Sequence, residues 1–319
     1  MKEIGVKVSE ARIGIRTNTP QLVDKDKFFW LDTNFYSIEK ISFKKAKDSL
    51  VEIVDVTGNP TMEVEGDLLR LTGPFSQLEE ETQDKRFSLF GNLGIFSSWV
   101  LKTLEEKHKI VTFHACALVK GDVFLVILGG AGAGKTVFIL SGLQKGWQLF
   151  STEFVHFRVK GDVKFYKGPV KDPVRVDTLT DHFPDIIERL GVNIADKVGG
   201  KTIVDLSSFQ SGEYLCTNPK VVLVIPHVEE KRERVIQKDV DDRDAFLRIL
   251  FHNASDKVSK STLLYREFAI PGVDTESLVQ KRTENIRNLL RSGVIKQSMK
   301  WISGVHDVLG FFDQFNPEL

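Results

Sequence analysis

The sequence predicts an α/β fold of the mixed α+β kind, arranged in two domains. Three observations support this prediction. The first 90 residues are rich in β-forming segments, an apolar strand leads through a glycine-rich turn into a helix at 123–143, and helical patterns dominate the last third of the chain. The chain has 319 residues, 41% of them apolar, so two hydrophobic cores are within its reach.

Residues 1–90 are expected to form a β-rich N-terminal domain. Segments 28–38, 51–56 and 61–71 carry alternating apolar residues or strong β-formers, and glycine and proline turn signals separate them. The acidic segment 78–86 is expected to be a loop or the edge of a helix.

Residues 91–319 are expected to form the second domain, with a helical C-terminal part. A helix is predicted over 92–107, followed by a hairpin of strands 111–119 and 123–128 and then a helix over 135–145. The other expected elements are a strand at 147–152, a hairpin at 156–168, a short helix at 181–191, a strand and loop at 201–209, a buried strand at 221–228, and helices at 241–254, 275–291 and 296–312.

Composition excludes several classes of protein. Lysine plus arginine (44) equals aspartate plus glutamate (44), which argues against nucleic acid or an anionic membrane as the main partner. No apolar run is long enough to span a bilayer or to act as a signal peptide. Cys116 and Cys216 lie far apart and suggest a reducing compartment, so a cytoplasmic protein is expected.

The turn after residue 128 matches the phosphate-binding pattern G-x-x-x-x-G-K-[ST]. Its backbone N–H groups would hold phosphate oxygens, Lys135 would reach the outer phosphates, and the Thr136 hydroxyl would bind Mg²⁺. A glycine-rich turn without a ligand is the alternative, but the flanking strand and helix favour phosphate binding. The predicted nucleotide-binding residues are Gly129, Gly130, Ala131, Gly132, Ala133, Gly134, Lys135 and Thr136.

Two further residues stand close to this loop in the expected topology. Glu153 follows the strand after the loop helix, at the sheet edge where open α/β sheets bind ligands. His114 lies on the strand before the loop, where a buried structural histidine is the alternative. Neither a base-reading Asn-Lys-x-Asp motif nor a distant strand ending in aspartate is present, which argues against a switch GTPase or a motor ATPase.

These residues together resemble a known family. Phe113-His114-Ala115-Cys116-Ala117, then Gly121, GGAGAGKT, Gly146 and LFSTE are similar to the catalytic core of HPr kinase/phosphorylase, whose fold is like that of phosphoenolpyruvate carboxykinase. The resemblance covers about 111 to 170 and extends more weakly to about 260. It implies a P-loop core of this type, with ATP and Mg²⁺ as cofactors, and it leaves a homo-oligomer open.

The resemblance also implies roles for particular residues. His114 would sit beside the transferred phosphate, and Glu153 would bind metal or take the proton from the attacking hydroxyl, so that Thr136 and Glu153 are the metal residues. The family has two aspartates where this chain has Thr152 and Glu153. Another carboxylate would then share the work, and Asp162, Asp172 and Asp177 are the nearest in sequence.

The predicted reaction is phosphoryl transfer from ATP to a hydroxyl group. Glu153, His114, Lys135 and Arg175 are the predicted catalytic residues, with Arg175 as a cation on the acceptor side or, equally, a surface partner of a neighbouring aspartate. The Gly-Arg-Asn stretch tied to phosphorylase activity in the family is missing, so an acceptor other than HPr is expected.

A small metabolite such as a sugar, a polyol of the inositol type or an amino acid is the first prediction for the acceptor. A protein or peptide serine is the alternative, and a nucleotide sensor without catalysis is a further one. A polar loop is expected at 253–262, with Asn253, Lys257 and Lys260 in it. Such a loop could line the acceptor pocket, but a solvated connection is the more common case.

Overall fold

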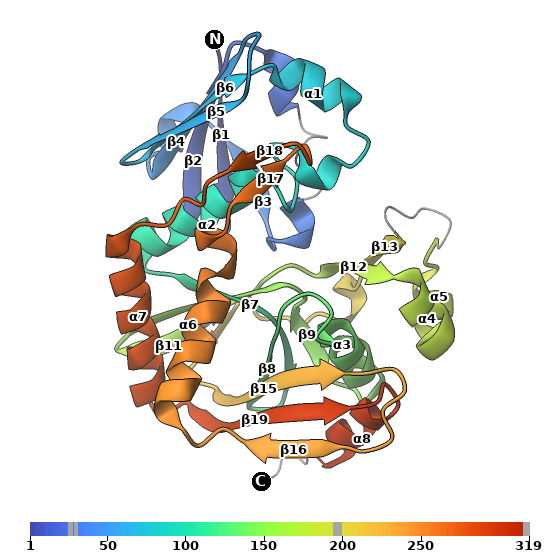
Figure 1. Cartoon of the computed structure of the whole chain (residues 1–319). Coiled ribbons are helices and arrows are strands. Elements are labelled where there is room, and N and C mark those ends of the chain that lie inside the picture. The colour runs from blue at the N-terminus through green and yellow to red at the C-terminus, as the bar shows by residue number, and fades with distance from the viewer. Residues whose placement is uncertain (25–27, 29–30, 194–199, 315–319) are drawn as a thin grey trace. The chain divides into compact units, whose positions relative to one another are not determined.

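The computed structural model describes residues 1–24, 28, 31–193 and 200–314 of the chain. Its fold is mixed α/β, as the sequence predicts, and it divides into two compact units (Figure 1). The first unit holds residues Met1–Val111 and Ser255–Arg282, and the second holds Thr112–Ala254 and Thr283–Leu319. The expected boundary at residue 90 therefore falls inside the first unit, to which residues 255–282 also belong.

The first unit is built on a sheet of six strands within its described residues, in the order β3-β1-β2-β4-β6-β5. Strands β2, β4 and β6 run parallel, and the other neighbours are antiparallel. The bounds are β1 Lys2–Val8, β2 Ala11–Thr17, β3 Ile38–Ile41, β4 Ser49–Asp55, β5 Thr61–Glu65, β6 Leu68–Gly73, α1 Phe75–Glu81, α2 Ile95–His108, β17 Thr262–Leu264 and β18 Phe268–Ile270.

The strand expected at 28–38 is wrong in its described residues. Residues 31–33 form a 3-10 turn, and a strand begins only at Ile38. Two aromatic side chains of this segment, Phe28 and Phe35, are buried in the core instead of forming a ladder: the Phe28 ring lies 4.5 Å from Phe90 and 6.1 Å from Phe96 between centroids. Residues 29–30 lie outside the described residues. Apolar burial, rather than strand pairing, accounts for the apolar pattern here.

A mixed sheet forms the second unit, with nine strands among its described residues in the order β14-β11-β10-β7-β8-β15-β19-β16 and with β9 paired to β7. Strands β8, β15 and β19 are parallel neighbours, whereas β7 and β8 form the predicted antiparallel hairpin. The bounds are β7 Val111–Lys120, β8 Val123–Leu128, β9 Gln148–Ser151, β10 Phe154–Lys160, β11 Asp162–Tyr166, β14 Leu215–Thr217, β15 Lys220–Val228, β16 Ile236–Asp239 and β19 Ile295–Ser303.

A two-stranded ribbon and several helices complete the second unit. The ribbon pairs β12 with β13 antiparallel, and Val174 and Val204 of its inner face join the core beneath α3. Helices α6 and α7 each continue from one unit into the other along the chain. The bounds are β12 Lys171–Arg175, β13 Lys201–Asp205, α3 Lys135–Gln144, α4 Val176–His182, α5 Pro184–Leu190, α6 Arg243–Ser259, α7 Glu276–Arg291 and α8 Asp307–Gln314.

Two expectations about the C-terminal third are wrong. The helix expected at 296–312 is strand β19 followed by α8, because Met299, Trp301 and Ser303 are buried on alternate positions of an extended chain. The polar loop expected at 253–262 is largely helix, since α6 continues to Ser259. Polar residues there lie on exposed turns of a helix whose buried positions, such as Ala254 and Val258, keep its inner face apolar.

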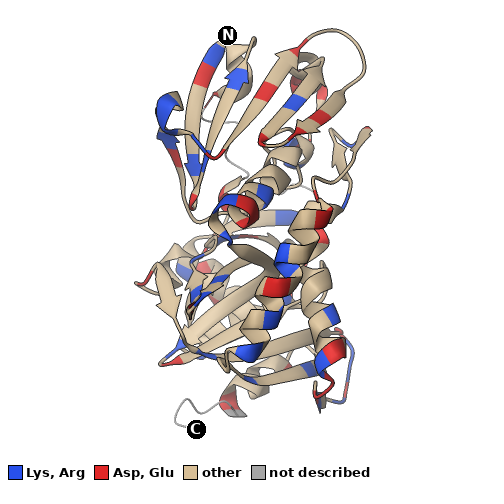
Figure 2. Ribbon diagram, turned by 90° about the vertical axis from the view of Figure 1, so that its left-hand side faces the viewer, with Lys and Arg blue, Asp and Glu red and all other residues tan. Residues whose placement is uncertain are grey.

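Basic and acidic residues are mixed along the described part of the chain. Figure 2 shows basic and acidic residues interspersed along the helices and strands, which fits the net charge of zero. Among the described residues, no helix combines the length and the apolar character needed to cross a membrane.

A buried arginine ties residues 255–282 to the first unit. Arg282 is fully buried, and its guanidinium donates to the Glu105 carboxylate at 2.9 Å, the Asp274 carboxylate at 2.8 Å and the Ser255 hydroxyl at 2.9 Å. Removal of the cation would leave two carboxylates buried without compensation.

We therefore predict that Arg282→Met lowers the free energy of unfolding by about 3–5 kcal/mol, measured by chemical denaturation. Arg70→Met is the control, because Arg70 is exposed and its pair with Glu52 is expected to contribute little to the free energy of unfolding. Equal losses for the two variants would contradict the assigned role of Arg282.

Candidate active site

The glycine-rich loop connects β8 to α3 and passes close to the end of β15. Gly134 has φ +98°, and a Cβ placed on it would lie 2.3 Å from Cγ2 of Val228. Gly132 has φ +82°, also in the left-handed region. The Val228 N–H donates to the Ala133 carbonyl at 3.3 Å. The loop conformation therefore requires glycine at 134 for both backbone angle and space.

The first turn of α3 faces this loop with unpaired backbone donors. Gly134 is the N-cap and provides no side-chain hydrogen bond. The first N–H groups of a helix lack partners within the helix, and the helix dipole places partial positive charge at the same end. An anion is therefore the chemically complementary ligand for this turn.

Lys135 is turned back onto the loop in the described conformation. Its ammonium donates to the Gly129 carbonyl at 2.7 Å and lies 3.1 Å from Nε2 of His114 and 3.9 Å from Oε2 of Glu153. The side chain is 9% exposed. The Lys135 ammonium is thus surrounded by a neutral carbonyl, an imidazole and a carboxylate.

His114 and Glu153 come together as the sequence predicts. The imidazole Nε2 lies 2.9 Å from Oε1 of Glu153. The backbone fixes both residues, because the Ala115 N–H donates to the Glu153 carbonyl at 3.0 Å and the Asn253 amide of α6 donates to the His114 carbonyl at 2.8 Å. Asn253 therefore makes this contact from helix α6, whereas the sequence predicted a polar loop at this position.

Asp172 is the residue that sequence reasoning did not single out from its neighbours. Its carboxylate lies in β12 and accepts a hydrogen bond from the Thr136 hydroxyl at 3.0 Å. Burial, and next the negative charge of Glu153, raise the pKa of Asp172 to about 6. The only sequence signal was proximity, which Asp162 and Asp177 shared; the structure selects Asp172 because it alone of the three is buried.

Arg175 lies apart from this cluster. It is exposed, and strand alternation places it on the opposite face of β12 from Asp172. Its cross-strand neighbour in β13 is Lys201, which offers it no negative charge. The loop residues, His114 and Glu153 are brought together, and Arg175 is not.

The cluster could hold a magnesium ion together with nucleotide phosphates. Within the described residues, no three metal-ligating side chains of the His, Cys, Asp or Glu type gather at one point. Mg²⁺ commonly takes only one or two protein oxygens and completes its shell with phosphates and water. Thr136 and Asp172, with Glu153 near them, fit that demand, whereas a zinc centre would need more ligands.

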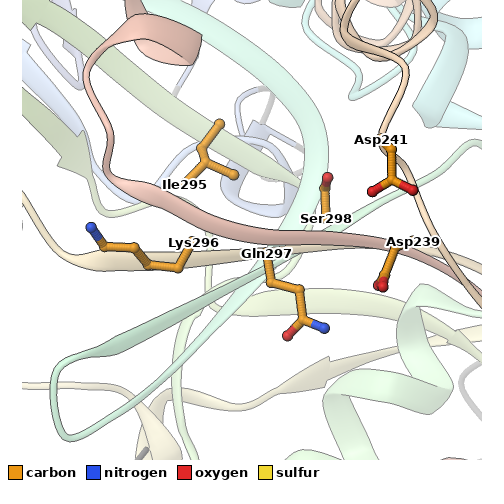
Figure 3. Close-up of a pocket in the computed structure, with 6 residues that line it drawn as sticks. All are labelled: Asp239, Asp241, Ile295, Lys296, Gln297 and Ser298. Atoms are coloured by element: carbon orange, nitrogen blue, oxygen red, sulfur yellow. The ribbon is translucent and has the colours of Figure 1, made fainter.

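A separate hollow lies at the opposite edge of the sheet. Its volume is about 270 Å³, and it is lined by Asp239, Asp241, Ile295, Lys296, Gln297 and Ser298. Figure 3 shows Lys296 at one end and the two aspartates at the other. Four of these residues, 295–298, lie at the start of β19, and Asp239 ends β16. Strands β19 and β8 both run parallel to β15, and the far end of β8 carries the glycine-rich loop. The hollow is therefore not part of the cluster around Lys135.

Comparison with known proteins gives no assignment: no family model matches this chain, and no curated protein is significantly similar to it.

The loop geometry predicts a sharp difference between two glycines. Gly134→Ala is expected to lower the thermal midpoint and to weaken phosphate binding, because the methyl group meets Val228 and the φ angle is unfavourable. Gly130→Ala is the control for stability, since a Cβ there has no neighbour within 4 Å. Thermal unfolding of both proteins measures the difference, and an unchanged midpoint for Gly134→Ala would contradict the loop conformation.

The buried carboxyl of Asp172 predicts a dependence of stability on pH in the ligand-free chain. A raised pKa means that the folded state binds the proton more tightly, so this contribution is present below pH 3.8 and is lost as the pH rises to about 6. Asp172→Asn keeps an oxygen for Thr136 and removes the charge. We expect this variant to be more stable than the wild type at pH 8, by roughly 2–4 °C for each 1 kcal/mol gained.

Thermal unfolding from pH 4 to pH 8 without metal or nucleotide measures this effect. The difference between the two midpoints should grow as the pH rises through 6. A difference that stays constant across this range would show that Asp172 does not carry the buried charge.

Proposed function

We propose that this chain is an ATP-dependent kinase that transfers the γ-phosphoryl group to a hydroxyl of a small molecule. We further propose that its core is of the HPr kinase and phosphoenolpyruvate carboxykinase type. The observation that carries the proposal is the convergence of two carboxylates, Glu153 and Asp172, on Lys135 and Thr136 at the start of α3. A turn that served only to connect a strand to a helix would have no need of this charge arrangement.

The nucleotide phosphates would lie against the backbone N–H groups of the loop. Lys135 would leave the Gly129 carbonyl and donate to phosphate oxygens, a better acceptor for an ammonium than a neutral carbonyl. The residues proposed for ATP binding remain Gly129 to Thr136, and the preference for ATP over other nucleotides rests on the family resemblance.

Thr136 and Asp172 would hold Mg²⁺, with Glu153 close enough to contribute charge. The ion would neutralise negative charge that spreads over the phosphoryl oxygens during transfer. This assignment supplies the second carboxylate that Thr152 cannot provide.

Glu153 is the better general base of the two carboxylates. Its side chain is 23% exposed, so an acceptor can reach it, whereas Asp172 is 5% exposed and bonded to Thr136. His114 contacts the same carboxylate at 2.9 Å and would orient it toward the hydroxyl. The geometry thus supports a division of work, with Glu153 on the acceptor side and Asp172 on the metal side.

A small alcohol is preferred as the acceptor over a protein serine. Figure 2 shows basic and acidic residues mixed along the ribbon, and the net charge is zero, so no dominant charge favours a charged protein partner. Sugars, polyols of the inositol type and amino acids remain the proposed class. A protein or peptide serine kinase is the alternative, and a nucleotide sensor is the non-catalytic one.

Kinetics with Mg-ATP and a panel of sugars, polyols, amino acids and serine peptides tests the proposal. Glu153→Gln should lower kcat by about 10²–10⁴-fold without loss of nucleotide binding, because a general base acts only in the transfer step. Lys135→Ala should weaken nucleotide binding as well. Lys145→Ala is the matched control, since Lys145 lies at the other end of α3 and pairs with Asp313 on the surface.

Three outcomes separate the candidate functions. Phosphate transfer only to a peptide or protein would favour the serine kinase. Nucleotide binding without transfer to any acceptor would favour the sensor. A wild type that binds no nucleotide would contradict the proposal as a whole.

A further inference from the structure

Thr152 is a buried residue that directly precedes Glu153 in the chain and contacts the segment just before Asp172. It is 1% exposed, and its hydroxyl donates to the main-chain carbonyls of Lys171 at 2.8 Å and Pro169 at 3.2 Å. The Thr152 N–H also donates to the Pro169 carbonyl, at 2.9 Å. One residue therefore holds the chain just before Asp172 through both its backbone and its side chain.

The same turn is fixed on its other side by β7. The Glu153 carbonyl accepts from the Ala115 N–H at 3.0 Å, and the Ser151 hydroxyl donates to the Phe154 carbonyl at 2.6 Å. Glu153 follows Thr152 directly, and Asp172 follows Lys171, one of the two acceptors of the Thr152 hydroxyl. The spacing between the two carboxylates is thus set through Thr152.

We propose that Thr152 is a positioning residue, which holds the start of β12 so that Asp172 meets Thr136 at the metal side of the site while Glu153 stays on the acceptor side. This inference rests on the proposed binding of magnesium nucleotide. Thr152 itself touches neither the loop nor the nucleotide in this arrangement.

The chemistry of the position explains why it carries a hydroxyl. The Thr152 hydroxyl lies within hydrogen-bond distance of two carbonyl oxygens, and carbonyl oxygens only accept hydrogen bonds. An ionised aspartate offers only acceptors, and it would add a third buried negative charge near Glu153 and Asp172. Threonine is therefore compatible with a carboxylate supplied by β12, and aspartate is not.

The test compares Thr152→Val, Thr152→Ser and Thr152→Asp with the wild type. The first readout is the affinity of the protein–ADP complex for Mn²⁺, measured by electron paramagnetic resonance. The second is binding of a fluorescent ADP analogue without metal. Groups that hold metal ligands in place by hydrogen bonds typically contribute 10–100-fold to metal affinity.

We expect Thr152→Val to weaken Mn²⁺ binding by about 10-fold or more, because the Lys171 carbonyl loses the Thr152 hydroxyl as a donor. Thr152→Ser should restore it, and metal-free ADP binding should be the same in all folded variants. Thr152→Asp should not bind Mn²⁺ more tightly than the wild type. The thermal midpoint of each variant identifies any protein that has lost its fold.

Two results would overturn the inference and leave the proposed kinase function intact. One is Mn²⁺ affinity in Thr152→Val equal to that of the wild type. The other is tighter Mn²⁺ binding in Thr152→Asp, which would mean that this position is itself a metal site. Failure of the wild type to bind ADP would instead contradict the proposed function.

Discussion

The hydrogen bond from Thr136 to Asp172 is the contact on which the candidate site depends. It joins the first turn of α3 to β12, a strand of a separate two-stranded ribbon. Through it, a buried carboxylate is kept at the start of the loop helix, although burial and the charge of Glu153 disfavour its ionised form. A bound cation would relieve this cost, so the ligand-free chain holds an arrangement that favours a metal ligand.

The loop and the carboxylates constrain each other through the sheet. β8 and β15 are parallel neighbours, and the end of β15 contacts the loop closely enough that only glycine fits at 134. β7 and the turn after β9 bring His114 and Glu153 to the same edge. Proteins with open α/β sheets commonly bind ligands at the carboxyl edge of the parallel strands, where the loops that follow the strands lie.

Local sequence patterns predicted the elements around the glycine-rich loop, but they did not predict the contacts between residues far apart in the sequence. The hairpin before the loop, the loop itself and α3 depend on short-range signals: alternating strands, a Lys120–Asp122 turn and glycines at fixed spacing. The convergence of His114 and Glu153 followed from that topology. Asp172 did not, because neither the pairing of β12 with β13 nor its burial leaves a pattern around residue 172.

The wrong elements share a physical cause. Phe28 and Phe35 of the segment 28–38 are buried in a core. Residues 296–303 fit both a strand alternation and a helical spacing, and pairing with β15 and β16 makes them a strand. Tertiary contacts decided both cases. The same is true of residues 255–282, which the Arg282 network attaches to the first unit despite their distance from it in sequence.

A crystal structure with Mg²⁺ and a non-hydrolysable ATP analogue tests the central claim most directly. The account predicts the β- and γ-phosphates against the loop, Lys135 moved from the Gly129 carbonyl to a phosphate oxygen, and Mg²⁺ about 2.1 Å from the Thr136 hydroxyl with Asp172 as a direct or water-bridged ligand. Glu153 should face the γ-phosphate from the acceptor side. An empty loop, or a metal held by Glu153 while Asp172 stays bonded to Thr136, would contradict it.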